Sequence, residues 1–153
     1  MENRRVAVRA IILHDEKLLC VRQKNYNGNA LVSGNTYWCV PGGGVDIGEP
    51  LLPALKREMI EELGVKPTIG NLLYVQQFEF KGWEHMEFFF HITNPEDYLN
   101  LDISKTTHGA LELEEIDFIT PAEKTILPAF LTAEPLNEHA SHFTGTKFFN
   151  YLT

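Results

Sequence analysis

Three glutamates stand close together near the middle of the chain, at a spacing that could bind a metal ion. They are Glu58, Glu61 and Glu62, and at about 100° per residue a helix would hold their side chains within an arc of about 100°. Each like-charge pair at this spacing costs about 0.2–0.5 kcal/mol on an exposed helix. A divalent cation such as Mg²⁺ would turn that repulsion into attraction, because it takes several oxygen ligands. The alternative is a solvated acidic face, partly neutralised by cations such as Arg57.

A glycine-rich segment, "PGGG" at 41–44, precedes these acids. Glycine lets backbone groups approach an ion or a phosphate closely, so Gly43 and Gly44 are candidate substrate-binding residues. A tight turn is the other role of such a segment, and either role predicts that the run interrupts regular structure.

The acids need a helix to position them, and the sequence predicts one over about 50–63. Its apolar stripe repeats at helical spacing and consists of Leu52, Leu55, Met59 and Leu63. Pro50 suits a first helical position, and Gly64 suits the residue just past the end. Pro53 lacks a donor for the first intrahelical bond, so we expect a distorted first turn or a start later than Pro50.

The remaining elements are mostly strands. Alternating or branched runs predict strands at 37–40, 69–80, 83–93 and 111–119, and a hairpin of 6–13 with 18–23. Thr120 resembles an N-cap for a helix over 121–131, and 25–36 and 94–109 read as loops. This order predicts an α+β or mixed α/β sandwich. We expect one domain over 1–153, with its core at about 4–131 and an aromatic tail at 134–153 packing on it.

The amino-acid composition argues against several classes of function. The net charge of −8 argues against a nucleic-acid backbone as partner, although a metal ion could still mediate phosphate binding. Cys20 and Cys39 lie in apolar runs and read as buried free thiols rather than a disulfide framework or zinc site. No signal peptide or membrane span is visible, so we expect a cytoplasmic protein.

Taken together, residues 43–65 resemble the Nudix box, the signature of Nudix hydrolases. The pattern is Gly, five residues, Glu, seven residues, Arg-Glu, an apolar residue, any residue, Glu-Glu, any residue, Gly and an apolar residue. The matching positions are Gly43, Glu49, Arg57, Glu58, Met59, Glu61, Glu62, Gly64 and Val65. The resemblance implies an α/β/α sandwich around a mixed β-sheet.

The resemblance also implies an activity. Family members hydrolyse the diphosphate linkage of a nucleoside diphosphate bonded to another group, with Mg²⁺ or sometimes Mn²⁺. It implies that Glu58 and Glu62 bind the metal directly, with Glu61 third and the carbonyl of Gly42 as a further ligand. Arg57 and Glu49 would pair with each other and orient Glu58. Family members commonly dimerise, so a homodimer is an open alternative.

Other candidate residues lie outside the box. The general base is a box glutamate or a loop acid, with Glu112 as candidate and Glu114 and Glu115 as rivals. Arg22 could meet a phosphate, or it could be an edge-strand cation. Tyr26 is the better candidate for stacking on a base, with Tyr37 beside it. The remaining candidates read mainly as structural residues: Trp38, His85, Glu87 and His91.

Two other functional readings remain. One is a nucleotide-sensing or protein-binding module that has lost catalysis, which the intact box acids argue against. The other is an isomerase acting on a prenyl diphosphate, for which no supporting pattern of Cys and Glu is present. The box does not specify the base, sugar or other appended group, so the substrate stays open among oxidised nucleoside triphosphates, ADP-ribose, nucleotide sugars and dinucleoside polyphosphates.

Overall fold

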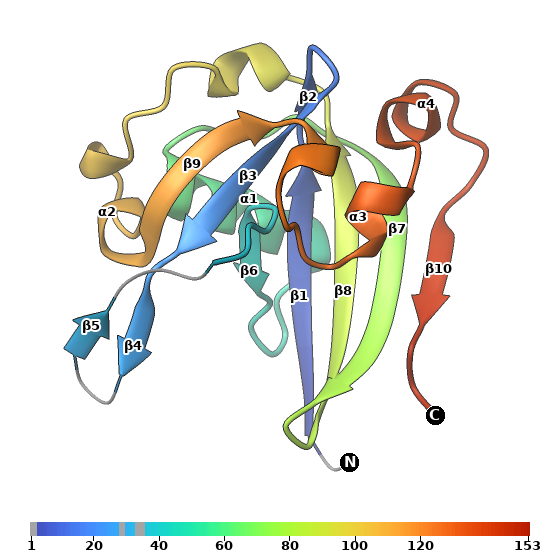
Figure 1. Cartoon of the computed structure of the whole chain (residues 1–153). Helices are drawn as coiled ribbons and strands as arrows, with labels where there is room; N and C mark the ends of the chain where they lie inside the picture. Colours follow the sequence, from blue (N-terminus) through green and yellow to red (C-terminus); the bar gives the residue numbers. More distant parts are fainter. Residues whose placement is uncertain (1–2, 28–29, 33–35) are drawn as a thin grey trace.

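The computed structural model describes residues 3–27, 30–32 and 36–153, and within these residues five strands form a mixed sheet. In the order β10-β7-β8-β1-β6, they are β10 (Lys147–Asn150), β7 (Ile69–Phe80), β8 (Trp83–Ile92), β1 (Asn3–Ile11) and β6 (Gly42–Gly44). β1 runs parallel to β8, and β7 and β6 run antiparallel to their neighbours β8 and β1. The sheet is seen face-on in Figure 1.

A second described sheet crosses the first and joins β2 (Leu13–His14), β3 (Lys17–Gln23) and β9 (Leu113–Ile119). The predicted hairpin of 6–13 with 18–23 is therefore only partly right. β1 stays in the large sheet, and only the two residues of β2 pair with β3. Most of β3 pairs with β9 instead, about 95 residues later in the chain. A small hairpin of β4 (Asn25–Asn27) and β5 (Ala30–Val32) follows β3.

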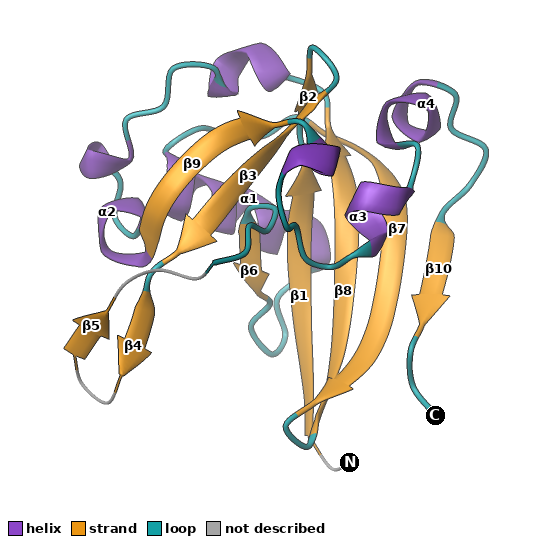
Figure 2. Cartoon of the chain, in the orientation of Figure 1, coloured by secondary structure: helices purple, strands orange, loops and turns teal. Residues whose placement is uncertain are grey.

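Helices cover both faces of the large sheet, as Figure 2 shows in purple. α1 (Leu51–Leu63) packs with β1, β3 and β8 around one hydrophobic cluster. α3 (Phe130–Ala133) and α4 (Leu136–Ser141) contribute to a second cluster on the opposite side. The short elements that remain are α2 (Gly109–Glu112), η1 (Pro95–Tyr98), η2 (Ile103–Lys105) and η3 (Pro121–Glu123). The predicted α/β/α sandwich around a mixed sheet is confirmed.

Helix α1 begins at Leu51, one residue later than Pro50. The first intrahelical bond runs from the amide of Ala54 to the carbonyl of Pro50 at 3.1 Å. Pro53 therefore removes no bond, because the first amides of a helix lack intrahelical partners. The helix ends at Gly64, whose φ of 75° places it in the left-handed region that glycine adopts easily.

The buried face of α1 differs from the predicted stripe at one position. Leu55, Met59 and Leu63 are buried, but Leu52 is 48% exposed and Ala54 takes its place in the core. Glu62 is also buried on this helix, although it is an acid.

The prediction that 41–44 interrupts regular structure is wrong for Gly42–Gly44, which form β6. They pair antiparallel with β1, with Val8 opposite Gly43 and Arg9 opposite Gly42. Gly42 has φ of +143°, and a Cβ there would lie 2.1 Å from the carbonyl oxygen of Val8. Glycine is required at this position because the two backbones approach so closely. Conversely, the predicted strand at 37–40 is reduced to isolated bridges at Trp38 and Cys39.

The predicted helix over 121–131 is also wrong. Only the single turns η3 and α3 are helical there. Between them the chain runs extended beside Trp38, whose amide donates to the carbonyl of Thr125 at 2.8 Å and whose carbonyl accepts from Leu127 at 2.9 Å. These long-range backbone bonds replace the helical ones, and Pro128 could not have donated to a helix.

The segment after the second cluster returns to the large sheet. β10 pairs in parallel with β7, with Phe149 opposite Gln76, and the ring of Phe149 stacks on Phe130 at a centroid distance of 4.4 Å. In the part of the chain that the structure describes, no helix is long and apolar enough to cross a membrane.

Candidate active site

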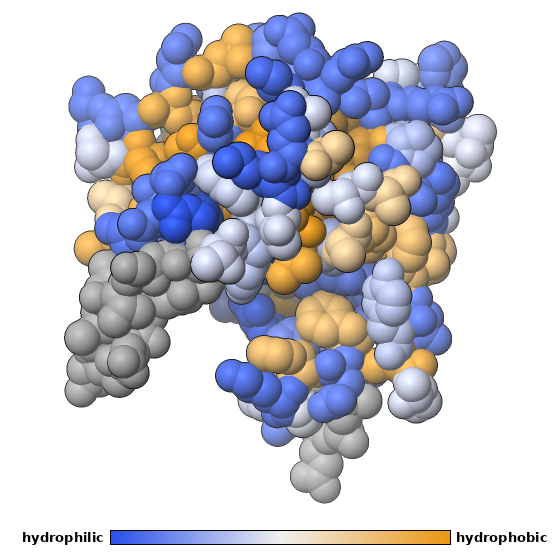
Figure 3. Space-filling view, in the orientation of Figure 1, coloured by the Kyte–Doolittle hydropathy of each residue, from blue (hydrophilic) through white to orange (hydrophobic). Residues whose placement is uncertain are grey.

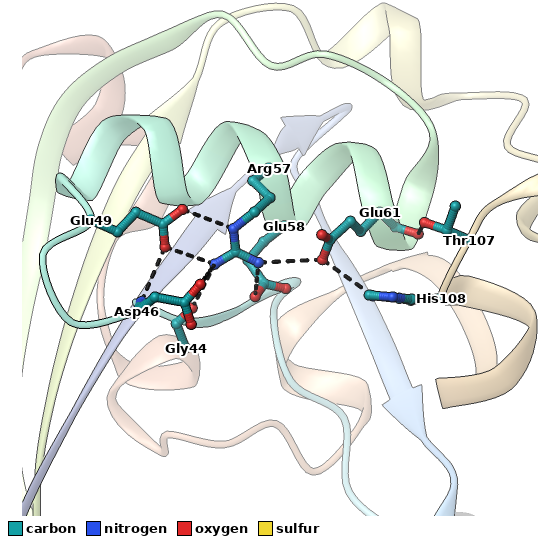
Figure 4. A network of polar contacts seen from close by, with 8 residues as sticks. All are labelled: Gly44, Asp46, Glu49, Arg57, Glu58, Glu61, Thr107 and His108. Atoms are coloured by element: carbon teal, nitrogen blue, oxygen red, sulfur yellow. Dashed lines mark hydrogen bonds and ion pairs between the residues drawn. The ribbon is translucent and has the colours of Figure 1, made fainter.

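Arg57 is the centre of a polar network between α1 and the loop that follows β6 (Figure 4). Its Nε and Nη2 donate to the two carboxylate oxygens of Glu49, each at 2.8 Å. Nη2 also donates to the carbonyl of Gly44 at 3.1 Å, and Nη1 donates to Glu58 at 3.0 Å. Hydrogen bonds from Arg57 lower the pKa of Glu49 to about 2. One guanidinium therefore ties the loop, the strand β6 and the helix together.

Glu58 lies directly against the backbone of β6. A Cβ added to Gly43 would lie 2.5 Å from the carboxyl carbon of Glu58, so only glycine leaves room for this carboxylate. Burial raises the pKa of Glu58, and the hydrogen bond and charge of Arg57 oppose that rise. The carboxylate is thus held in place by a cation on one side and a glycine backbone on the other.

Glu62 is the most deeply buried of the three glutamates near the end of α1, with 3% of its surface exposed. Its Oε2 has no hydrogen-bond partner among the described residues. Burial raises the pKa of this carboxyl to about 8, while the charge of Arg9 and a backbone hydrogen bond with Gly42 act in the opposite direction. A buried carboxylate with an unpartnered oxygen is costly, and a bound cation would remove that cost.

The pairing of β6 with β1 directs backbone groups toward these acids. The amide of Val45 donates to the Val6 carbonyl at 2.9 Å. In an antiparallel pair, every second residue forms hydrogen bonds with the partner strand. The backbone groups of Gly44 and Gly42 therefore point away from β1. The Gly44 carbonyl accepts from Arg57 accordingly. The backbone of Gly42 is therefore available on the side of Glu62.

Glu61 completes the acidic edge and brings in a residue that the sequence did not single out. Its Oε2 lies 3.3 Å from Arg57 Nη1 and 3.2 Å from Nδ1 of His108. The amide of His108 also donates to the Glu61 carbonyl at 2.9 Å, so the loop before α2 caps the end of α1. No local pattern marks His108, which comes from a loop 47 residues further along the chain.

These side chains surround an open cleft of about 360 Å³. Its lining includes acids, arginines and the β6 glycines: Arg5, Arg9, Gln23, Gly42, Gly43, Gly44, Arg57, Glu58, Glu61, Glu62, His108 and Glu112. Among the described residues, no group of three or more His, Cys, Asp or Glu side chains is already arranged as a metal cage. The donor set nevertheless fits a hard divalent cation, because oxygen ligands suit Mg²⁺ and Glu62 offers a buried oxygen without a partner.

A second, more apolar compartment of about 470 Å³ adjoins the cleft, and Arg9 and Gln23 line both. Its walls carry the aromatic side chains Tyr37, Phe78, Phe80, Phe89 and Tyr151. Arg9 Nε pairs with Glu87 at 2.8 Å, and Gln76 donates to the other oxygen of Glu87 at 3.1 Å. In Figure 3, orange hydrophobic surface is visible in the middle of the face, among blue hydrophilic side chains.

The model of the NUDIX domain family matches residues 3–132 of this chain. The chain belongs to the Nudix hydrolase family. The match contains the box, the cleft and most of the second compartment, but it ends before α4 and β10.

Individual Nudix proteins resemble this chain over different lengths. Diphosphoinositol polyphosphate phosphohydrolase 2 of Rattus norvegicus is 38% identical over 78 residues, which are 49% of this chain and 42% of that protein. The chain therefore matches less than half the length of this curated relative. The solution structure of the E. coli ORF135 protein has a TM-score of 0.67 at 24% identity, covering 94% of this chain and 96% of that one. The MutT protein from Methanosarcina mazei Go1 has a TM-score of 0.67 at 21% identity, covering 94% and 99%.

Only some of the other candidate residues lie at the cleft. Glu112 lines the cleft, while neither Glu114 nor Glu115 is part of its lining. Glu115 pairs with Arg22, whose guanidinium lies 6.0 Å from the centre of the Trp38 ring. Arg22 is not part of the lining of either compartment, so its predicted phosphate contact does not follow from this geometry.

The aromatic candidates also lie in different places. Tyr37 lines the apolar compartment, whereas Trp38 is buried in the core, as predicted. Tyr26 lies in β4, where only the backbone is described, so its predicted stacking role falls outside the described side chains and stays a prediction.

The predicted structural residues take three different positions. His85 stacks on Phe78 at 4.8 Å, and burial lowers the pKa of His91. Glu87 lines the apolar compartment.

Both cysteines are free. Cys20 is buried, but Cys39 is only partly buried and lines the same apolar compartment. The prediction of two buried thiols is therefore right for Cys20 alone.

Three further lining residues of the cleft were missed by sequence reasoning: Arg5, Arg9 and Gln23. Arg9 gave one signal, because it interrupts the apolar run of β1. A buried charge within a strand needs a partner, and Glu87 on the neighbouring strand supplies it. Arg5 and Gln23 carry no comparable signal.

Proposed function

We propose that this protein is a Mg²⁺-dependent hydrolase that cleaves the diphosphate linkage of a nucleoside diphosphate bonded to another group, with Mn²⁺ as an alternative metal. The observation that carries the proposal is the buried carboxyl of Glu62, which has an oxygen without a partner among the described residues and lines the same cleft as Glu58. We further propose a single domain over 1–153 and a cytoplasmic location, and a homodimer stays the alternative to a monomer.

Each residue of the cleft has a role in this proposal. Glu58, Glu62 and the carbonyl of Gly42 would hold the metal, with Glu61 as a further ligand. A bound divalent cation would polarise phosphoryl oxygens and lower the pKa of a coordinated water. Arg57 positions Glu58 through their 3.0 Å contact and has no need to touch the substrate.

The positive charges of the cleft would receive the phosphates. Arg5 lies on the β1 side, beside Gly44, and Arg9 lies where the two compartments meet. The protein carries a net charge of −8, so these local cations and the metal must offset its repulsion of a polyanion. Glu112 lines the cleft, and in this proposal its carboxylate takes a proton from the attacking water.

The residues that line the second compartment favour a nucleotide over a polyphosphorylated inositol. The rat relative is named for diphosphoinositol polyphosphates, and such a ligand needs many cations around its ring. Among the residues that line the apolar compartment, the cation is Arg9, which is already paired with Glu87. Aromatic walls instead suit the flat, apolar face of a base.

The test is an assay of purified protein with Mg²⁺ against nucleoside diphosphate derivatives and a diphosphoinositol polyphosphate, with Glu62→Gln as the comparison variant. Metal-dependent cleavage of a nucleotide that is lost in the variant supports the proposal. Cleavage of the inositol compound alone contradicts the substrate class. If nucleotides bind but stay intact, the protein is a sensing module of the same fold, which is the second candidate function.

A further inference from the structure

The C-terminal segment, residues 133–153, lies beyond the part of the chain that the family model matches. It is nevertheless firmly attached to the large sheet. Leu136 is buried in the second core cluster, and the ring of the buried His139 lies 3.0 Å from the Leu73 carbonyl. Thr146 donates to the Leu72 carbonyl at 2.7 Å, just before β10 begins. The segment is therefore a fixed part of the fold.

The register of β10 determines which of its side chains face the apolar compartment. Phe149 lies opposite Gln76 on β7, and the amide of Tyr151 continues the pairing by donating to the Gln77 carbonyl at 2.8 Å. Side chains alternate along a strand, so Phe149 and Tyr151 share one face and Phe148 points to the other. Phe148 is accordingly 74% exposed.

Tyr151 thereby becomes part of the compartment. Its ring is nearly parallel to that of Phe149, with an interplanar angle of 13° and centroids 6.4 Å apart. Phe149 is held in turn by its stacking on Phe130. Tyr151 lines the apolar compartment together with Phe78 and Gln76 of β7, yet 53% of its surface stays exposed. An anchored, half-exposed ring at the edge of an open pocket has a free surface for a ligand.

We propose that residues 133–153 are a substrate-recognition segment of this protein, and that Tyr151 contacts the base of the nucleotide. This inference rests on the proposed function, because it assigns the apolar compartment to the base. The side chain of Gln76 adds a hydrogen-bonding group to the lining of the apolar compartment. Its amide NH₂ donates to Glu87, so its oxygen, which has no partner among the described residues, is left to accept a hydrogen bond from a ligand.

The experiment compares Tyr151→Ala with Phe148→Ala, in the full chain with Mg²⁺. Phe148 is a matched control because it is an aromatic of the same segment on the opposite face. Tyr151→Phe keeps the ring and serves as the conservative variant. Stacking of a base on an aromatic ring corresponds to about a 10-fold effect on binding or more. We therefore expect Tyr151→Ala to raise KM about 10-fold with little change in kcat, while Phe148→Ala and Tyr151→Phe stay near the wild type.

The outcomes separate this inference from the proposed function. If the wild type cleaves nucleotides and Tyr151→Ala behaves as Phe148→Ala does, the recognition role is wrong and the hydrolase proposal stands. If the wild type cleaves nothing, the hydrolase proposal fails, and the same variants are compared by calorimetric titration with ADP-ribose and GDP. A selective loss of affinity in Tyr151→Ala then supports the recognition role. Equal affinities, or no binding by the wild type, overturn it.

Discussion

The guanidinium of Arg57 forms two parallel hydrogen bonds, each 2.8 Å long, with the carboxylate of Glu49, which lies eight residues earlier in the chain. This two-point contact fixes the orientation of the guanidinium. The same group then reaches Glu58 at 3.0 Å. Glu49 thus acts on the candidate metal ligand through Arg57, although it is not part of the lining of the cleft.

Glu49→Gln should therefore weaken catalysis without touching the metal. Loss of a group that orients a ligand commonly costs 10- to 100-fold in metal affinity or activity, and we expect a fall in kcat/KM of that size. The measurement is kcat/KM across a Mg²⁺ titration. Asp46→Asn is the control, because Asp46 is 81% exposed and its carboxylate lies 3.8 Å from Arg57. Equal activity of the two variants would contradict the orienting role of Glu49.

The buried carboxyl of Glu62 predicts a dependence of stability on pH. Its pKa is about 8 in the folded protein, against an ordinary value of 4.5. The folded state therefore holds this proton more tightly than the unfolded state. The contribution to stability is fully present below pH 4.5 and is lost as pH rises to about 8. Each unit of difference in pKa corresponds to about 1.4 kcal/mol, so the loss amounts to a few kcal/mol.

Glu62→Gln removes this titration. In EDTA, we expect the variant to have a higher free energy of unfolding than the wild type at pH 8, and the difference should shrink toward pH 5. Adding Mg²⁺ should reverse the order, because a cation that binds only the folded state stabilises it and the variant lacks that ligand. Urea unfolding at both pH values, with and without Mg²⁺, measures this. A difference that is independent of pH would contradict the burial of an ionisable proton at Glu62.

Glu112 and Glu114 offer a comparison of two acids two residues apart. Glu112 lines the cleft, whereas Glu114 is exposed on β9 outside it. Removing a general base costs about 10²- to 10⁴-fold. We expect Glu112→Gln to lower kcat by about 10²-fold or more, while Mg²⁺ affinity falls little. Glu114→Gln should leave kcat unchanged. A normal kcat in Glu112→Gln would assign the proton transfer to a box glutamate instead.

Arg9 and Glu87 pair across β1 and β8, where both side chains are largely buried. Removing one member of a buried pair leaves the other charge uncompensated and costs about 3–5 kcal/mol. Arg9→Met should lower the free energy of unfolding by that amount, as measured in urea. The double variant Arg9→Met with Glu87→Leu should recover much of it, because neither member of the pair is then left as an uncompensated charge. If the double variant is as unstable as the single one, packing rather than charge explains the loss.

The sequence alone was sufficient for the features that depend on local periodicity. The spacing of Glu58, Glu61 and Glu62 places them on one helix edge wherever that helix lies, because the α-helix repeats every 3.6 residues. Gly64 ends the helix for a local reason as well. The strands 69–80 and 83–93 were predictable because alternation and the Lys81-Gly82 turn are both read from neighbouring residues.

Long-range pairing decided the rest. Gly42–Gly44 form a strand only because β1 supplies their backbone partners, and no local pattern contains that information. His108 reaches Glu61 across 47 residues, and Tyr151 reaches the apolar compartment through the register of β10 on β7. Register depends on which buried faces pack together. A stretch of sequence can therefore indicate which acids would bind a metal, while the side chains that surround the rest of a substrate become known only when distant strands are placed side by side.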